Sequence, residues 1–149
     1  MQFHKIGDIN FFLLPSFSYF SFYQAAHSIF GKDAKKIIYV LFKNAGEDLG
    51  QKLRENRIMD PTSVLNELGY GRITIQKFSK QIKLALFNVP HLKPFLDAEY
   101  SERVDFHLCG FFAGLFSGIF EKQYNCYESK CYLKNFKSCE FICRESDVS

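Results

Sequence analysis

The sequence contains no tryptophan, and the motifs of several common enzyme classes are also missing. It has no glycine-rich phosphate loop, no dinucleotide fingerprint and no pair of carboxylates with the spacing expected for acid–base catalysis. The four histidines, His4, His27, His91 and His107, form no recognisable pattern with serine, cysteine or carboxylate residues. We therefore expect a surface or helix-capping role for each histidine.

The sequence also lacks a strong excess of charge. There are 19 Lys and Arg residues against 16 Asp and Glu, a formal net charge of +3, and no run of basic residues is present. Nucleic acid is therefore not an expected partner. The N-terminus has no basic leader followed by an apolar region of signal-peptide length, and the apolar stretch 106–120 is too short to cross a bilayer. We expect a cytoplasmic protein without a membrane span.

Metal-binding residues, in contrast, are concentrated in the last third of the chain. Cys109, Glu128, Cys131 and Cys139 have the spacing Cys-x18-Glu-x2-Cys-x7-Cys. Thiolates and carboxylate oxygens are zinc ligands, and a closed tetrahedral site takes four of them. The odd count of five cysteines and a reducing compartment also favour a metal over disulfides. The sequence therefore predicts one structural Zn²⁺ bound by these four residues. The alternative is that the cysteines are small apolar core residues.

The same residues carry a resemblance to a known family. The segment Glu128-x2-Cys131-x3-Asn135-x3-Cys139-x-Phe141, preceded on a helix by Cys109-Gly110-Phe111-Phe112-Ala113-Gly114, resembles the 4-vinyl-reductase (hydrocarbon-binding) domain family. The stretch 37–50 is similar to the second helix of that family. Asn135 stands where the family usually has glycine, and asparagine tolerates a positive φ angle. The segment from helix to strand is about one helical turn shorter than the family pattern.

This resemblance implies a fold and a class of function. Family members are small-ligand-binding domains, found alone in archaea or as the sensor half of aromatic-responsive transcription activators. They share a fold with vesicle-tethering TRAPP subunits and, more distantly, with haem nitric-oxide-binding domains. Carried onto this sequence, the family's pocket wall becomes Leu84, Leu86, Ala113 and Cys126. These residues are small or apolar, so the expected ligand is apolar, larger than a phenol and held mainly by burial.

Three classes of function stay open at this point. The leading one is a domain that binds an apolar small molecule. The second is a reductase acting on a vinyl group in tetrapyrrole metabolism, as the family name implies, but hydride chemistry needs a cofactor site that the sequence does not show. The third is a structural or assembly subunit, implied by the kinship with tethering proteins.

Hydrophobic periodicity predicts one α+β domain over residues 1–149, with an antiparallel sheet of two hairpins covered by helices. Helices are expected at about 16–30, 34–53, 61–68 and 102–120, and strands at 72–76, 82–86, 123–128 and 139–144. Zinc would join the C-terminal hairpin to the last helix. The irregular stretch 88–102, which contains His91 between two prolines, has a length typical of a functional cover.

Glycines recur every four residues in the last helix, at Gly110, Gly114 and Gly118. Three glycines cost a helix about 3 kcal/mol relative to alanine, so a close contact must offset this cost. The contact is either tight packing on the sheet or another helix, or a hollow where a ligand approaches the backbone.

Aromatic residues are abundant, with 18 phenylalanines, which fits either an aromatic core or a ring-lined pocket. They surround most of the first helix, at Phe17, Phe20, Phe22, Tyr23 and Phe30. An exposed aromatic surface of this size usually marks an interface, so we expect a homodimer.

Overall fold

The computed structural model describes residues 3–6, 9–12 and 14–146. Its strands are β1 (Phe3–Ile6), β2 (Ile9–Phe12), β3 (Arg72–Lys77), β4 (Gln81–Phe87), β5 (Tyr124–Lys130) and β6 (Cys139–Glu145). Its α-helices are α1 (Ser18–Phe30), α2 (Ala34–Glu55), α3 (Thr62–Asn66), α4 (Lys93–Asp97) and α5 (Phe106–Phe120). Short 3-10 segments are η1 (Gly31–Asp33), η2 (Pro90–Leu92) and η3 (Tyr132–Lys134).

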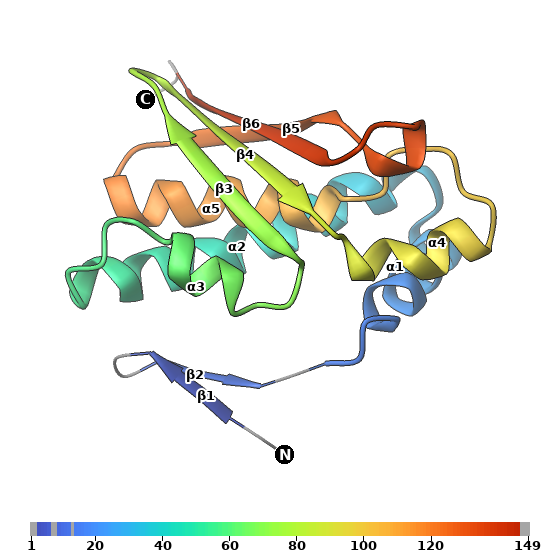
Figure 1. Cartoon of the computed structure of the whole chain (residues 1–149), viewed down its shortest axis with the longest axis horizontal. Helices are drawn as coiled ribbons and strands as arrows, with labels where there is room; N and C mark the ends of the chain where they lie inside the picture. Colours follow the sequence, from blue (N-terminus) through green and yellow to red (C-terminus); the bar gives the residue numbers. More distant parts are fainter. Residues whose placement is uncertain (1–2, 7–8, 13, 147–149) are drawn as a thin grey trace.

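The main sheet is antiparallel, with the strand order β3-β4-β6-β5. Figure 1 shows this sheet lying over α5, with α2 behind α5 and the β1–β2 hairpin at the opposite side of the molecule. In β4, Ile82, Leu84 and Leu86 alternate with partly exposed residues and are buried in the core. This alternation is what a strand with one covered face requires. The predicted α+β class and both predicted hairpins are confirmed.

Helix α5 is bound to its two neighbours in different ways. Toward the sheet, Ser117 Oγ donates to the Ala113 carbonyl at 2.7 Å and accepts from the Tyr124 amide of β5 at 3.0 Å. Toward α2, the glycines allow backbone to touch backbone. A Cβ placed on Gly114 would lie 2.0 Å from the Lys43 carbonyl oxygen. A Cβ would likewise lie too close to a backbone carbonyl oxygen of the facing helix at the other glycines of this contact, Gly46, Gly50, Gly110 and Gly118. The glycines therefore serve helix–helix packing.

Three features differ from the sequence-based expectation. The β1–β2 hairpin was not predicted, and the stretch 88–102 contains η2 and α4. Helix α5 begins at Phe106 and not at residue 102. The C-terminal hairpin pairs Cys126 with Cys143 and Glu128 with Phe141. A β-bulge between Glu128 and Lys130 shifts the register at the end of β5, which a regular two-residue alternation cannot anticipate.

Among the described residues, no helix combines the length and the apolar character needed to cross a membrane. The start of α5 instead meets four other segments: α1, η2, β5 and the loop after β5. Here the buried polar residues collect, namely His91, Asp105, His107 and Glu128.

Candidate metal centre and ligand cavity

Three of the four predicted zinc ligands come together at the tip of the C-terminal hairpin. Glu128 at the end of β5, Cys131 and Cys139 each place a ligand atom within 4.8 Å of the others, and all three are buried. The loop between the cysteines turns at Asn135, whose φ of 67° confirms the expected left-handed residue. The Tyr132 amide donates to Cys139 Sγ at 3.4 Å. The loop is thus shaped as a knuckle around the two thiols.

The protonation of this group fits a metal site. A hydrogen bond from the Cys139 thiol lowers the pKa of Cys131 and raises that of Cys139. Burial, together with the neighbouring Asp105, raises the pKa of Glu128 to about 11. Both carboxyl oxygens of Glu128 are buried without a hydrogen-bond partner. Buried polar atoms are normally paired, so two thiols and an unpaired carboxyl are a donor set that Zn²⁺ would satisfy.

Cys109, the fourth predicted ligand, is not part of this group. Its thiol lies against the thiol of Cys126, which is the largest cause of the raised Cys109 pKa, and it neighbours the backbone of Glu128. Cys109 is buried in the first turns of α5 and therefore close to the knuckle. Its role as a zinc ligand stays a prediction.

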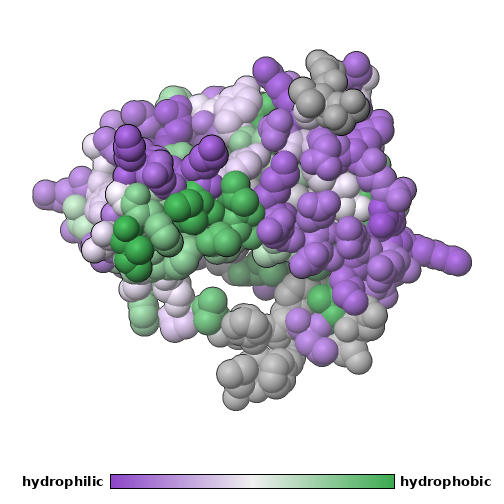
Figure 2. All heavy atoms as spheres, turned by 180° about the vertical axis from the view of Figure 1, so that it is seen from behind, coloured by the Kyte–Doolittle hydropathy of each residue, from purple (hydrophilic) through white to green (hydrophobic). Residues whose placement is uncertain are grey.

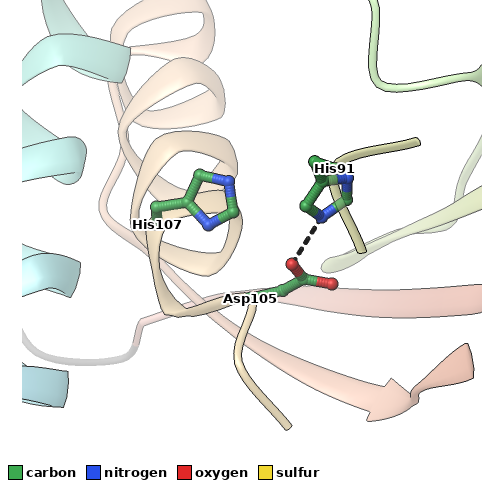
Figure 3. A group of neighbouring side chains, drawn as sticks. All are labelled: His91, Asp105 and His107. Atoms are coloured by element: carbon green, nitrogen blue, oxygen red, sulfur yellow. Dashed lines mark hydrogen bonds and ion pairs between the residues drawn. The ribbon is translucent and has the colours of Figure 1, made fainter. Parts of the chain in front are cut away.

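A second group of candidate ligands lies beside the first and was not predicted from the sequence. His91 of η2, Asp105 just before α5 and His107 in the first turn of α5 place one ligand atom each within 4.8 Å of one another. Figure 3 shows the two imidazoles side by side, with the Asp105 carboxylate beneath His91. His91 Nε2 and Asp105 Oδ1 are 2.6 Å apart and share a hydrogen bond. His91 and His107 are only 4% and 1% exposed, so the expected surface role is wrong for both.

Charge in this second group centres on Asp105. Burial alone would raise the pKa of Asp105, but His91, His107 and the neighbouring Glu128 carboxyl hold it below its usual value. Burial lowers the pKa of His107, so this imidazole is neutral. Both of its ring nitrogens are buried without a hydrogen-bond partner, as is Nδ1 of His91. Asp105 thus connects the two groups, and the imidazoles keep unused donor and acceptor capacity.

The two imidazoles open on a cavity of about 530 Å³ on the helical side of the molecule. Its apolar lining comes from Leu14, Pro15, Phe22, Phe42 and Leu68, and its polar lining includes Tyr19, Tyr70, His91 and His107. The Tyr19 ring stacks on His107 with centroids 3.4 Å apart, and its hydroxyl donates to the Val104 carbonyl. The rings at the cavity floor are therefore fixed in place.

The residues predicted to contact a ligand lie elsewhere. Leu84, Leu86, Ala113 and Cys126 are buried in the core between α5 and the sheet, and none of them lines this cavity. The small residues of α5 that suggested a hollow instead permit the contact with α2. Ligand contact at these four residues stays a prediction.

Sequence reasoning missed His91, Asp105 and His107 because they are separated along the chain and match no known spacing. Two signals were present in the sequence. His91 lies in the irregular stretch singled out as a functional cover, and Asp105 stands one helical turn before Cys109, on the same helix face.

Comparison with solved structures finds this fold in three proteins with different descriptions. Subunit 3 of a trafficking protein particle complex from Naegleria fowleri, covalently bound to palmitic acid, has a TM-score of 0.65 at 12% identity, covering 89% of this chain and 93% of its own. The phenol-responsive sensory domain of the transcription activator PoxR, solved with phenol, has a TM-score of 0.73 at 12% identity, covering 95% and 79%.

The third is a vinyl-4-reductase family protein from Methanocaldococcus jannaschii, with a TM-score of 0.63 at 21% identity, covering 91% of this chain and 84% of its own. Neither protein-family models nor curated proteins gave a match. At these identities the likeness shows a shared fold. One of the three proteins belongs to the vinyl-4-reductase family, which this sequence resembles.

Proposed function

We propose that this chain is a small-molecule-binding domain with a structural zinc ion in its C-terminal hairpin. The observation that carries the proposal is the cavity of about 530 Å³, in which apolar side chains of α1 and α2 meet two buried imidazoles. Small-ligand sites are concave and mostly apolar, with a few fixed polar groups that orient the ligand, and their volumes fall in this range. Two proteins of the same fold are described with phenol or palmitic acid bound.

The ligand that fits this lining has an apolar body and one polar end. Its apolar part would lie against Phe22, Phe42 and Leu68, and its polar end would face His107. Each buried methylene contributes about 0.8 kcal/mol to binding, whereas a polar end that pairs with His107 mainly fixes the orientation.

Zinc in this proposal is held by Cys109, Glu128, Cys131 and Cys139. The proximity of Glu128, Cys131 and Cys139 supports it. A site closed by four protein ligands has a structural role. It would fix the loop after β5 against the start of α5.

The fold is also compatible with the two alternative functions. A vinyl reductase would need a bound nicotinamide or flavin. An assembly subunit would carry a stoichiometric protein partner. The material that copurifies with the protein distinguishes all three classes.

We further propose that the chain forms a homodimer through α1 and α2. Figure 2 shows hydrophobic side chains gathered on one face of the molecule. The exposed apolar residues include Phe17 (57% exposed), just before α1, and Ile29 (73%), Phe30 (46%) and Leu41 (54%) on the two helices. Tyr23, which was expected in this surface, belongs to the core. Light scattering at micromolar concentration should give a dimer for the wild type and a monomer for Leu41→Glu, with Leu96→Glu on α4 as the matched control.

The ligand proposal is tested by paired phenylalanine variants. Phe22 lines the cavity and is 39% exposed, whereas Phe136 lies in the loop between β5 and β6 and is 43% exposed. Titration with medium-chain fatty acids and alkylphenols should show about tenfold weaker binding for Phe22→Ser, because part of one aromatic contact is lost, and unchanged binding for Phe136→Ser. Equal affinities for the two variants would place the ligand outside this cavity.

A further inference from the structure

We propose that His91, Asp105 and His107 form a second metal site, which binds one divalent transition-metal ion independently of the thiolate group. The three residues come from different segments, yet their ligand atoms lie within 4.8 Å of one another in the interior. Figure 3 shows the two rings side by side, with the Asp105 carboxylate directly beneath His91, just before the start of α5. Two imidazoles and one carboxylate are a ligand set used by zinc and by non-haem iron.

His107 supplies the second observation that points to an occupant. It is 1% exposed, and neither Nδ1 nor Nε2 has a hydrogen-bond partner. A neutral imidazole has one N–H and one lone pair, and leaving them unpaired in the interior costs about 1–3 kcal/mol each. The ring cannot turn away easily, because Tyr19 stacks on one face and Phe42 meets it edge-on with centroids 5.5 Å apart. A metal ion would use the lone pair in the orientation already imposed.

The pair His91 and Asp105 needs only a small adjustment to accept the ion. His91 Nε2 and Asp105 Oδ1 are 2.6 Å apart because a proton now lies between them. Metal–nitrogen and metal–oxygen bonds of about 2.0–2.2 Å at a tetrahedral angle separate such atoms by about 3.3 Å. The metal therefore replaces the shared proton, which moves to Nδ1 of His91 or is released to solvent, and the two side chains move apart by less than about 1 Å.

The second site would also have an open coordination position. Its three protein ligands leave at least one position of the ion free, and both imidazoles line the cavity. A carboxylate or phenolate oxygen of a bound ligand could fill that position while its apolar part contacts Phe22 and Phe42. This last step, unlike the metal site itself, rests on the proposed ligand-binding function.

Cobalt titration of the reduced, metal-free protein tests the proposal. We expect two Co²⁺ ions per chain by native mass spectrometry, one with an intense thiolate-to-cobalt charge-transfer band and one that adds only weaker visible bands. His91→Ala and His107→Ala should each keep the thiolate-linked ion and lose the other. His27→Ala is the matched control, because its ring bonds the Tyr23 carbonyl on α1, and it should bind two.

A wild type that binds a single ion at saturating Co²⁺ and Zn²⁺ would overturn the proposal, as would two ions in both cluster variants. If a variant fails to fold by circular dichroism, the wild-type ion count and spectrum still decide. The ion count tests the second metal site, and the Phe22→Ser titration tests the proposed ligand-binding function, so either proposal can fail without the other. Fatty-acid binding by a one-ion protein would keep the proposed function and reject the second site, and two ions without fatty-acid binding would do the reverse.

Discussion

The glycine-bearing middle of α5 and the first turn of the same helix differ in how completely their groups are satisfied. From Gly110 to Gly118, the backbone of α5 lies directly on that of α2, with no room for a single added carbon. At the first turn, His107 and the neighbouring Asp105 keep buried polar atoms without hydrogen-bond partners. The first region has no room for an occupant, whereas the second leaves buried polar atoms that a bound ion or ligand would satisfy.

This difference indicates that the middle of α5 serves stability and that its first turn serves function. The middle of α5 stabilises the fold through packing that depends on the absence of side chains. The first turn holds charge and unpaired donors in the interior, a cost that folding alone does not offset. Functional groups are therefore expected at the beginning of α5, next to the loop that carries Cys131 and Cys139 and next to the cavity.

The largest expected effect comes from removing a thiolate of the knuckle. Cys131→Ser should lose the zinc and several kcal/mol of stability, since metal binding is coupled to folding. Cys143→Ser changes an equally buried thiol outside the group and should keep the metal. Elemental analysis and thermal melting measure both. The prediction fails if the Cys131 variant retains zinc and full stability in strong chelator.

Cys109→Ser sharpens the same comparison. If Cys109 is the fourth ligand, this variant should lose zinc as Cys131→Ser does. Full zinc content would mean that its thiol only packs against Cys126.

A methyl group added at the glycine contact between α5 and α2 should cause the next largest loss of stability. Gly114→Ala places a Cβ 2.0 Å from the Lys43 carbonyl oxygen, so the two helices must separate. We expect a loss of about 3 kcal/mol in the free energy of unfolding, measured by urea denaturation. Gly31→Ala meets no atom within 4 Å and disturbs only a positive φ, so it should cost about 1 kcal/mol. Equal losses would argue against the close helix contact.

The buried polar groups around the start of α5 should make the stability of the fold depend on pH. In the metal-free protein the pKa of Glu128 is raised by burial to about 11, so the folded state keeps a proton that the unfolded chain releases above about pH 4.3. The stability that Glu128 contributes is therefore lost as pH rises. The lowered pKa of His107 acts in the opposite sense, but only below about pH 6.5.

Cys131, whose pKa is lowered, opposes this trend up to about pH 8.5 in both proteins. Between about pH 7 and 8, the Tm of the metal-free wild type should therefore fall relative to that of Glu128→Gln. It should also fall relative to that of zinc-loaded protein, because its Glu128 has no proton to lose when zinc is bound. Parallel profiles for all three samples would show that Glu128 does not carry the effect.

The smallest effect is expected at the pocket inferred from the sequence. Ala113 is fully buried beside the sheet and does not line the cavity, so Ala113→Val should cost about 1–3 kcal/mol in stability through overpacking. The affinity for alkylphenols should change less than twofold. A tenfold loss of affinity with zinc still bound would return the ligand to the space between α5 and β4.

The sequence was sufficient for those parts of the fold that depend on local periodicity. The strand alternation at Ile82, Leu84 and Leu86 and the left-handed turn at Asn135 were both predicted and are confirmed. Three zinc-ligand candidates could be found because Glu128, Cys131 and Cys139 lie close together along one hairpin.

Contacts between distant segments could not be predicted in the same way. His91 and His107 meet because η2 folds back against the start of α5, a contact across 16 residues that no periodicity encodes. The glycine spacing indicated a close approach, but only the position of α2 shows that a helix makes it.

The glycine contact between α2 and α5 has a consequence for recognising distant relatives of this chain. Its five positions, Gly46 and Gly50 on one helix and Gly110, Gly114 and Gly118 on the other, are constrained together, because a side chain on either helix must be accommodated by the backbone of its neighbour. Substitution at one position should therefore be tolerated only with a compensating change across the contact. At identities of 12–21%, where whole-chain similarity is weak, two helices with glycine at this paired four-residue spacing offer a search pattern grounded in the fold.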